Sequence, residues 1–404
     1  MSSSPSSRTG RASFSSLPGE LQAAILGFAI NERRGWEDLD TLKSLVLVDK
    51  ACSSVAAPIY WRAVNLSRKS AAKLDTVLTL RESTREMVRQ VRTHRMQTWS
   101  YKTPVEMYAK IAKVVQSFPN VEGLEVCLVD SYEEGAPGWA FYDSLAAIHL
   151  KLERVKIYVF ASDWQEDGDD LSLPDALPLE LLDANKLERL SLDLSSLRQS
   201  DVDRCIQAIS RFAHLQHLAL RIRGATVPLP LITPVPSDLR SFHLEAFFEP
   251  IEASELSLFL QSVSPKLERL SLRCHLEGSL PTSFDFPNLR HLRCDAGNPI
   301  TLLHSFVSSP LKVLELVPPL SLFGGGDRSE YSLVECIQRL QKLELYITNE
   351  DILDSMDPSE IMPLIMLIKE RGIVYFDKTG NDEKELGELM WRDVMAEYEN
   401  WVDE

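Results

Sequence analysis

The sequence predicts an α/β solenoid, in which a parallel sheet is curved into an arc and helices lie on its convex side. Three observations predict this fold. The hexapeptide Leu-Glu-Arg-Leu-Ser-Leu occurs twice, at 187–192 and at 267–272. A looser hexad with apolar first, fourth and sixth positions recurs at steps of 22 to 35 residues. Helical patterns fill many of the intervals, and such a period is typical of repeat units too small to bury their own apolar faces.

Each hexad is expected to form one strand. On a strand the fourth and sixth positions point to one side, and the third, fifth and seventh positions point to the other. The predicted hexads open at Val88, Val121, Leu152, Leu187, Leu215, Leu239, Leu267, Leu289, Leu311 and Leu340. A further strand is expected within Gly372–Phe376.

The intervals between hexads predict the convex layer. Helical patterns occupy 70–87, 105–118, 139–148, 202–212, 256–263, 331–340 and 361–369. Proline-rich stretches at 228–236 and 281–287 are expected to replace a helix with irregular backbone, because proline breaks helices. The whole pattern resembles a leucine-rich-repeat array, and this resemblance implies a concave recognition surface.

The N-terminal part resembles a different family. Three blocks carry the resemblance: Leu17-Pro18-x-Glu20-Leu21-x3-Ile25-Leu26, Leu45-x-Leu47-Val48-x-Lys50, and Pro58-x-Tyr60-Trp61-Arg62-x-Val64. They resemble an F-box, a three-helix module that binds the Skp adaptor of a cullin–RING ubiquitin ligase. The resemblance assigns adaptor binding to Leu17, Pro18, Leu21, Ile25, Leu26, Leu45 and Val48. The alternative is a plain helical cap that seals the end of the array, and both roles are compatible.

Four regions follow from these patterns. Residues 1–15 are Ser-rich and are expected to be a disordered tail. Residues 16–66 form the F-box-like domain and residues 67–380 the solenoid. Residues 381–404 are expected to form a helix that caps the last strand through Leu386, Leu389, Met390 and Val394.

Composition bounds the function. The 404-residue chain has a net charge of -16, although residues 1–120 hold 18 Lys/Arg against 10 Asp/Glu. Without an aromatic–basic platform, this local excess indicates a solvated surface rather than a nucleic-acid site. No apolar run is long enough to cross a membrane, and the N-terminus lacks a secretory pattern. Six scattered cysteines indicate buried thiols in a reduced compartment, so a cytoplasmic or nuclear location is expected.

Several sequence patterns resemble ligand sites but lack residues that the ligand needs. The acidic loop at 163–169 lacks the glutamate that completes a calcium loop, and the glycine run at 324–327 lacks the Lys and Ser/Thr of a phosphate cradle. His217, His243 and His291 share a face but have no further ligands at metal-binding spacing. No nucleophile–base arrangement is evident. We therefore expect no metal, no cofactor and no enzyme activity.

Charge on the predicted concave face reverses the balance of the chain. From the third to the eighth hexad, the third, fifth and seventh positions hold seven basic and three acidic residues. Substrate binding is assigned to Arg189, Arg221, Arg269, Arg273 and Arg293. Arg269, Arg273 and Arg293 are expected to converge on one anion, which favours an acidic or phosphorylated protein partner. The alternative is that these charges serve only solubility.

Taken together, the two resemblances predict the substrate-recognition subunit of a Skp–cullin–F-box ubiquitin ligase. Its partners would be a Skp-type adaptor, through it a cullin, and an unidentified protein substrate. The alternative is a leucine-rich-repeat interaction scaffold with no ligase role.

Overall fold

The computed structural model describes residue 21 and residues 50–66, 71–93, 105–130, 151–161, 179, 182–195, 197–247, 249–281, 284–296, 299–316, 332–348 and 358–377. Within these ranges the protein has an α/β fold built on one long parallel sheet. The predicted tail, the helices at 139–148 and 382–401, the acidic loop and the glycine run lie outside the described residues.

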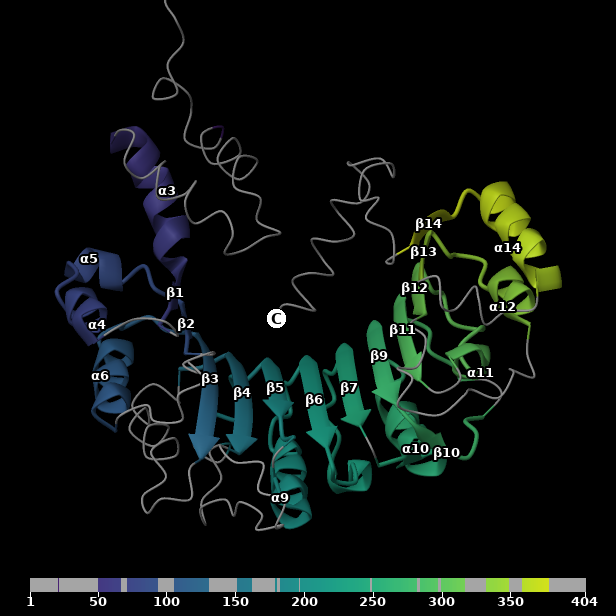
Figure 1. Ribbon diagram of the computed structural model, residues 1–404, viewed down its shortest axis with the longest axis horizontal. Coiled ribbons are helices and arrows are strands. Elements are labelled where there is room, and N and C mark those ends of the chain that lie inside the picture. Colours follow the sequence, from purple (N-terminus) through teal and green to yellow (C-terminus); the bar gives the residue numbers. More distant parts are fainter. Residues whose placement is uncertain are drawn as a thin grey trace, which may run out of the picture.

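Twelve strands of the described chain form this sheet, and their order in space follows their order in sequence. The strands line the inner side of an arc, and most of the helices lie on its outer side (Figure 1). The strands are β1 (Ala63–Asn65), β2 (Gln90–Arg92), β3 (Gly123–Asp130), β4 (Arg154–Ala161), β5 (Arg189–Asp193), β6 (His217–Arg223), β7 (Ser241–Phe247), β9 (Arg269–Cys274), β11 (His291–Ala296), β12 (Val313–Leu316), β13 (Leu345–Thr348) and β14 (Val374–Asp377). A separate two-stranded sheet pairs β8 (Ile251–Glu252) with β10 (Leu276–Glu277).

The described helices connect these strands. They are α3 (Lys50–Arg62), α4 (Ala71–Leu78), α5 (Glu82–Arg85), α6 (Val105–Gln116), α9 (Gln199–Ile209), the 3₁₀ helix η4 (Leu229–Leu231), α10 (Ala253–Val263), α11 (Pro299–His304), α12 (Leu333–Arg339) and α14 (Pro358–Arg371). No described helix is both long and apolar enough to span a membrane.

The hexads set the register of the sheet. The two identical hexads illustrate this, because Leu187, Leu190 and Leu192 are buried, as are Leu267, Leu270 and Leu272. Their third positions, Arg189 and Arg269, lie in one cross-strand row that also contains His217, Ser241 and His291. The predicted alternation between a buried and a concave face is therefore confirmed for these strands.

The tenth hexad was predicted in the wrong frame. Leu345 pairs with Val313, which holds the third position of its own hexad, so the tenth hexad opens at Leu343 rather than at Leu340. Leu340 instead ends helix α12 as its C-cap residue. Tyr346, which is fully buried, then takes the fourth position. The strand expected within Gly372–Phe376 is present as β14.

Two further expectations are corrected near the N-terminal end of the sheet. The single helix expected over 70–87 is two helices, α4 and α5, and Arg81 between them has extended backbone. The sheet also begins one strand before the first hexad, because Ala63–Asn65 pairs in parallel with β2. Helix α3 therefore leads without a break into the first strand.

The helices bury one face against the sheet. On α10, the Phe259 ring lies 4.7 Å from the ring of Phe242 on β7. The proline-rich stretch at 228–236 holds only the short helix η4, and 284–288 is irregular, as their prolines predict. Helix α14 ends at Arg371, and Gly372 follows it with a φ of 65°, which suits a residue without a side chain. Two backbone bonds, Ile373 N to Ile368 O and Gly372 N to Lys369 O, complete this C-cap.

Candidate functional site

The concave face of the sheet presents three parallel rows of side chains, one for each odd hexad position from the third to the seventh. We call the third-position residues from β4 to β11 the basic row: Arg154, Arg189, His217, Ser241, Arg269 and His291. The seventh-position residues from β5 to β9 form the charge ladder: Asp193, Arg221, Glu245 and Arg273. The fifth positions lie between them and include Lys156, His243 and Arg293.

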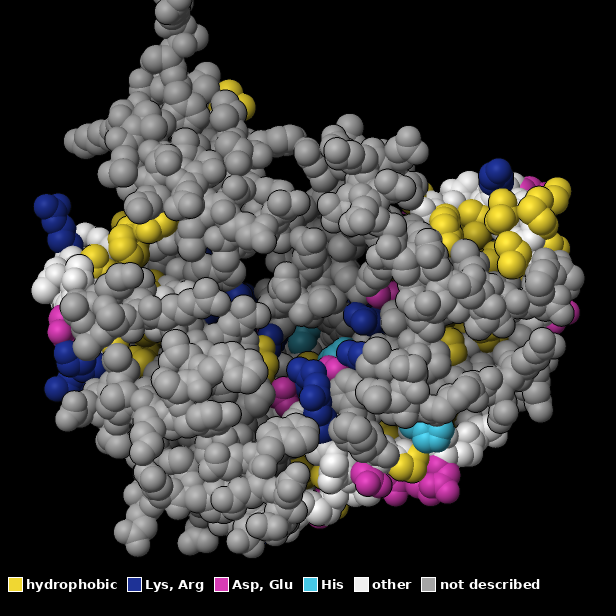
Figure 2. All heavy atoms as spheres, viewed as in Figure 1, with side chains coloured by type: hydrophobic (Ala, Val, Ile, Leu, Met, Phe, Trp, Pro, Cys, Tyr) yellow, Lys and Arg dark blue, Asp and Glu magenta, His cyan; other side chains and the backbone are white. Residues whose placement is uncertain are grey.

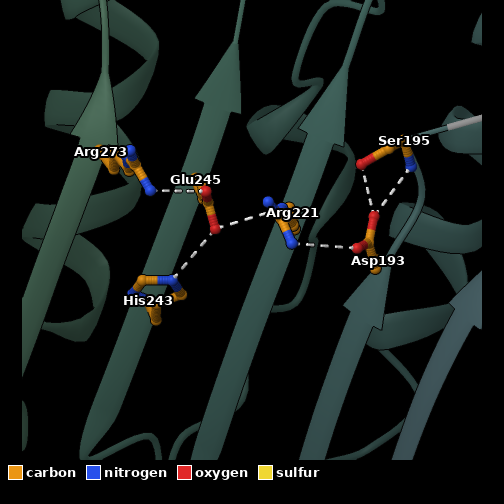
Figure 3. Close-up of polar contacts among 6 residues, drawn as sticks. All are labelled: Asp193, Ser195, Arg221, His243, Glu245 and Arg273. Carbon is orange, nitrogen blue, oxygen red and sulfur yellow. Dashed lines mark hydrogen bonds and ion pairs between the residues drawn. The ribbon is translucent and has the colours of Figure 1, made fainter. Parts of the chain in front are cut away.

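The charge ladder is a chain of ion pairs across four neighbouring strands (Figure 3). Arg221 lies between two carboxylates, with Nη1 3.5 Å from Asp193 and Nε 3.3 Å from Glu245. Arg273 donates to the other oxygen of Glu245 at 3.0 Å. The backbone N–H and the hydroxyl of Ser195 both donate to Asp193. Opposite charges that face each other in register stabilise the pairing of their strands.

The concave carboxylates are buried beneath their arginines. Glu245 is 8% exposed and Glu315 is fully buried. Burial raises the pKa of Glu245, but the interaction with His243, whose Nε2 lies 4.0 Å away, and the charges of Arg221 and Arg273 more than offset this, so the pKa is lowered. Arg293 pairs with Glu315, with Nε 3.7 Å from the carboxylate. These acids therefore contribute little negative charge to the open surface.

The basic row has a different charge balance. His217 lies in register between Arg189 and Ser241. Burial, followed by the charges of Arg189, Arg269, Arg154 and Arg240, lowers the pKa of His217 to about 4. His217 is consequently neutral at pH 7, and positive charge prevails around it.

A groove of about 350 Å³ runs over the concave face and is lined by residues of β2 to β7, β9 and β11. Its lining holds seven Lys/Arg side chains and three Asp/Glu side chains, so the excess is positive within an acidic chain. In the space-filling view, basic, acidic and histidine side chains gather in the hollow at the middle of the arc (Figure 2). The composition of this groove supports the predicted reversal of charge.

One aromatic side chain marks the N-terminal half of the groove. The Lys156 ammonium lies 5.0 Å from the centre of the Tyr158 ring, within cation–π range. Burial raises the pKa of Tyr158, and the charges of Glu125 and Asp193 add to the effect. Tyr158 therefore stays a neutral hydrogen-bond donor. Glu125, which acts on Tyr158, also forms an ion pair with Arg92 at 3.1 Å.

The structure separates the arginines assigned to substrate binding. Arg269, Arg273 and Arg293 do not converge on one anion-binding site. Arg273 forms an ion pair with Glu245, and Arg293 forms an ion pair with Glu315. Arg221 belongs to the charge ladder, while Arg189 and Arg269 belong to the basic row. The acidic residues, predicted from the sequence only as a minority on this face, are the partners of Arg221, Arg273 and Arg293.

The adaptor-binding residues lie almost wholly outside the described chain. Leu21 is the exception, and its side chain is 51% exposed. Leu17, Pro18, Ile25, Leu26, Leu45 and Val48 are not described, so their assignment stays a prediction. Of the third block, Tyr60 and Trp61 make an edge-to-face contact with ring centres 5.0 Å apart near the end of α3.

Within the described ranges, no group of three or more His, Cys, Asp or Glu side chains is placed to hold a metal ion. The three concave histidines are spread over β6, β7 and β11, where His217 and His291 hold third positions and His243 holds a fifth position. What the concave arrangement can do chemically is bind anions through guanidinium groups.

Comparison with known proteins finds similarity at the level of solved structures. No protein-family model and no curated protein sequence matches the chain. A leucine-rich repeat-containing protein, LegL7 from Legionella pneumophila, is similar over 79% of this chain and 91% of its own, with 16% identity and a TM-score of 0.40. The TLR13–ssRNA13 complex is similar over 71% of this chain, with 14% identity and a TM-score of 0.32. This chain spans 39% of the length of that second protein. The bound RNA belongs to that complex and is not carried over to this chain.

Proposed function

We propose that the protein is a repeat-based interaction scaffold whose concave groove binds an acidic segment of a protein partner. One observation carries the proposal: the groove lining is basic, seven side chains to three, in a chain of net charge -16. A positive patch on an acidic protein attracts negatively charged partners locally while the rest of the surface repels them.

The shape of the groove favours an extended segment over a small molecule. The groove is lined by eight neighbouring strands, β2 to β7, β9 and β11, whose seven spacings of about 4.8 Å correspond to roughly 34 Å. An extended chain of about ten residues covers that length. The lining mixes guanidinium groups with hydroxyl, imidazole and buried carboxylate groups, which suits a peptide with spaced charges.

Nucleic acid fits this groove less well. Single-stranded binders place successive bases on aromatic platforms, whereas the described lining includes one Phe, Tyr or Trp ring, that of Tyr158.

The test measures binding of fluorescein-labelled decaglutamate to the full chain by fluorescence anisotropy. We expect binding that weakens as salt is raised, because the attraction is screened. The double variant Arg154→Gln/Arg189→Gln should weaken binding at least tenfold. These arginines are chosen because they lie outside the charge ladder, so their loss leaves its buried carboxylates paired.

The matched control is Lys113→Gln/Arg211→Gln, which removes two charges from exposed sites in or just after α6 and α9. Its affinity should stay within about twofold of the unmodified protein. No binding of decaglutamate, or an equal loss in the control, would overturn the proposal. A labelled oligonucleotide that binds more tightly than the peptide would also overturn it.

A more specific function rests on the N-terminal resemblance. We propose that the scaffold serves as the substrate receptor of a Skp–cullin–F-box ubiquitin ligase. The supporting structural observation is that the block Pro58-x-Tyr60-Trp61-Arg62-x-Val64 joins α3 directly to the first strand of the sheet. A module bound at the N-terminus would thereby be coupled to the arc.

This second proposal is tested by co-expression with a Skp-type adaptor. The unmodified chain should co-purify with the adaptor, and Leu21→Asp/Ile25→Asp should not, while both retain the same circular dichroism spectrum and decaglutamate affinity. Failure of the unmodified chain to bind the adaptor would leave the scaffold function and remove the ligase role.

A further inference from the structure

The basic row is set apart from its neighbours by the absence of acidic residues. In the other two rows, every described carboxylate lies in register beside an arginine: Glu125 by Arg92, Asp193 and Glu245 by Arg221, Glu315 by Arg293. The described third positions from β2 to β13 are Gln90, Gly123, Arg154, Arg189, His217, Ser241, Arg269, His291, Val313 and Leu345. None of these is Asp or Glu, so the row supplies no negative charge of its own.

His217 marks the centre of this positive region. The charged groups that act on it come from each side: Arg154 on β4, Arg189 on β5, Arg240 just before β7, and Arg269 on β9. Ser241, its neighbour on β7, is neutral and almost fully buried. His243 is the nearest concave histidine along the next row, and it contacts Glu245 instead. An anion placed over His217 would therefore face guanidinium groups from several strands.

We propose that the basic row between β4 and β7 is a subsite for one phosphoryl group, carried by the acidic segment that the groove binds. This inference rests on the proposed function and names the group that the segment presents. The structure shows a local site: Arg154, Arg189, His217 and Ser241 all line the groove, at strand spacings of about 4.8 Å.

The charge and geometry favour a phosphoryl group over a carboxylate. A phosphoserine or phosphothreonine carries nearly two negative charges at pH 7 and three acceptor oxygens, whereas a carboxylate carries one charge and two oxygens. Guanidinium groups donate paired N–H bonds that match phosphoryl oxygens, and Arg154 and Arg189 occupy adjacent strands. The guanidinium groups of Arg154 and Arg189 can thus share one phosphoryl group, because its two negative charges balance their two positive charges.

Binding should change the state of His217. A dianion beside the imidazole counteracts the positive surroundings and favours the protonated form, in which both ring nitrogens donate. The pKa of His217 should therefore rise when the subsite is filled. This rise is a signature that general attraction between an acidic peptide and a distant basic patch would not produce.

The experiment compares two acidic peptides that differ at one position, which is phosphoserine in one and glutamate in the other. With the full chain, we expect the phosphopeptide to bind at least tenfold more tightly. His217→Asn identifies the ring signals of His217 by NMR. In the unmodified protein these signals should titrate at least one pH unit higher with the phosphopeptide than without peptide. Inorganic phosphate at millimolar concentration should compete, because it presents the same group without the segment.

The control separates the subsite from the groove as a whole. Arg189→Gln should bring the two peptide affinities to within about threefold of each other. Lys156→Gln removes one charge from the neighbouring row, so it should weaken both peptides while keeping their tenfold ratio. Equal affinities in the unmodified protein, with the His217 titration unmoved, would overturn the phosphoryl subsite and leave the acidic-segment function standing. If neither peptide binds, the proposed function itself fails.

Discussion

At the scale of single residues, the concave arginines divide into a group that pairs with buried carboxylates and a group in the basic row. Arg221, Arg273 and Arg293 pair with buried carboxylates at 3.0 to 3.7 Å, so the loss of any one of them would take a cationic partner from a buried charge. Arg154 and Arg189 belong to a row without acids. Charge reversal at Arg273 or Arg293 would therefore unfold the sheet locally and could not report on binding alone.

The first prediction concerns the central acid of the charge ladder. Glu245→Gln removes the charge that two arginines share, and we expect it to lower the free energy of unfolding by about 1–3 kcal/mol. Glu268→Gln is the matched control, because the 3.4 Å pair of Glu268 with Arg240 is solvent-exposed, and its cost should stay under about 1 kcal/mol. Urea denaturation followed by circular dichroism measures both. Equal costs would show that the ladder is not structural.

The second prediction concerns pH. The pKa of His217 is lowered in the folded protein, so the unfolded chain binds more protons between about pH 6.5 and the folded value of about 4. Stability should accordingly fall on acidification through this window, by at most about 1.4 kcal/mol per pH unit from this one group. The lowered pKa of Glu245 acts only below its ordinary range, near 4.5.

The check compares the unmodified protein with His217→Gln by urea denaturation at pH 7, 6 and 5. The variant should lose less stability on acidification than the unmodified protein does. Parallel curves for the two proteins would mean that His217 titrates normally in the fold.

At the scale of elements, hexad spacing was enough to place the nine strands of the long sheet from β2 to β12. Each of their hexads carries apolar residues at the first, fourth and sixth positions, except for Thr93 in the first hexad. The tenth hexad shows the limit of this reasoning. Leu340, Leu343 and Leu345 satisfy one frame completely, while the frame that opens at Leu343 places Tyr346 at the fourth position and the polar Thr348 at the sixth. The pairing of Leu345 with Val313 selects the second frame, and local spacing alone does not contain that information.

The charge ladder, in contrast, was available in the sequence. When the hexads at Leu187, Leu215, Leu239 and Leu267 are aligned, their seventh positions alternate in sign: Asp193, Arg221, Glu245, Arg273. Alternation in adjacent parallel strands predicts ion pairs, because residues at the same position lie beside each other. The basic row could be predicted in part from the same alignment, but the burial and pKa of His217 require the packed structure.

The third prediction tests how the convex layer attaches to the sheet. On α10, Phe259 packs on Phe242, whereas its neighbour Leu258 is 67% exposed. Phe259→Ala should lower the free energy of unfolding by about 3–5 kcal/mol, because it leaves a cavity in the core. Leu258→Ala should change it by no more than about 0.5 kcal/mol. Similar losses for the two variants would contradict the orientation of α10.

At the scale of the whole molecule, an acidic chain carries a basic inner surface. With a net charge of -16, the protein as a whole repels anions. The curved sheet nevertheless places arginines that are as far apart in sequence as Arg92 and Arg293 in one groove. Repetition makes this possible, since each repeat contributes one residue to each row. The outcome is a long recognition surface rather than a compact pocket.

The most direct test of this account locates the bound peptide. Decaglutamate with a central photoreactive benzophenone is cross-linked to the full chain, and the attachment sites are mapped by mass spectrometry. We predict cross-links to residues of β4 to β7 on the concave face, which Arg154→Gln/Arg189→Gln should remove. Cross-links on α9 or α10, or a pattern that this double variant leaves unchanged, would contradict the concave groove as the binding surface.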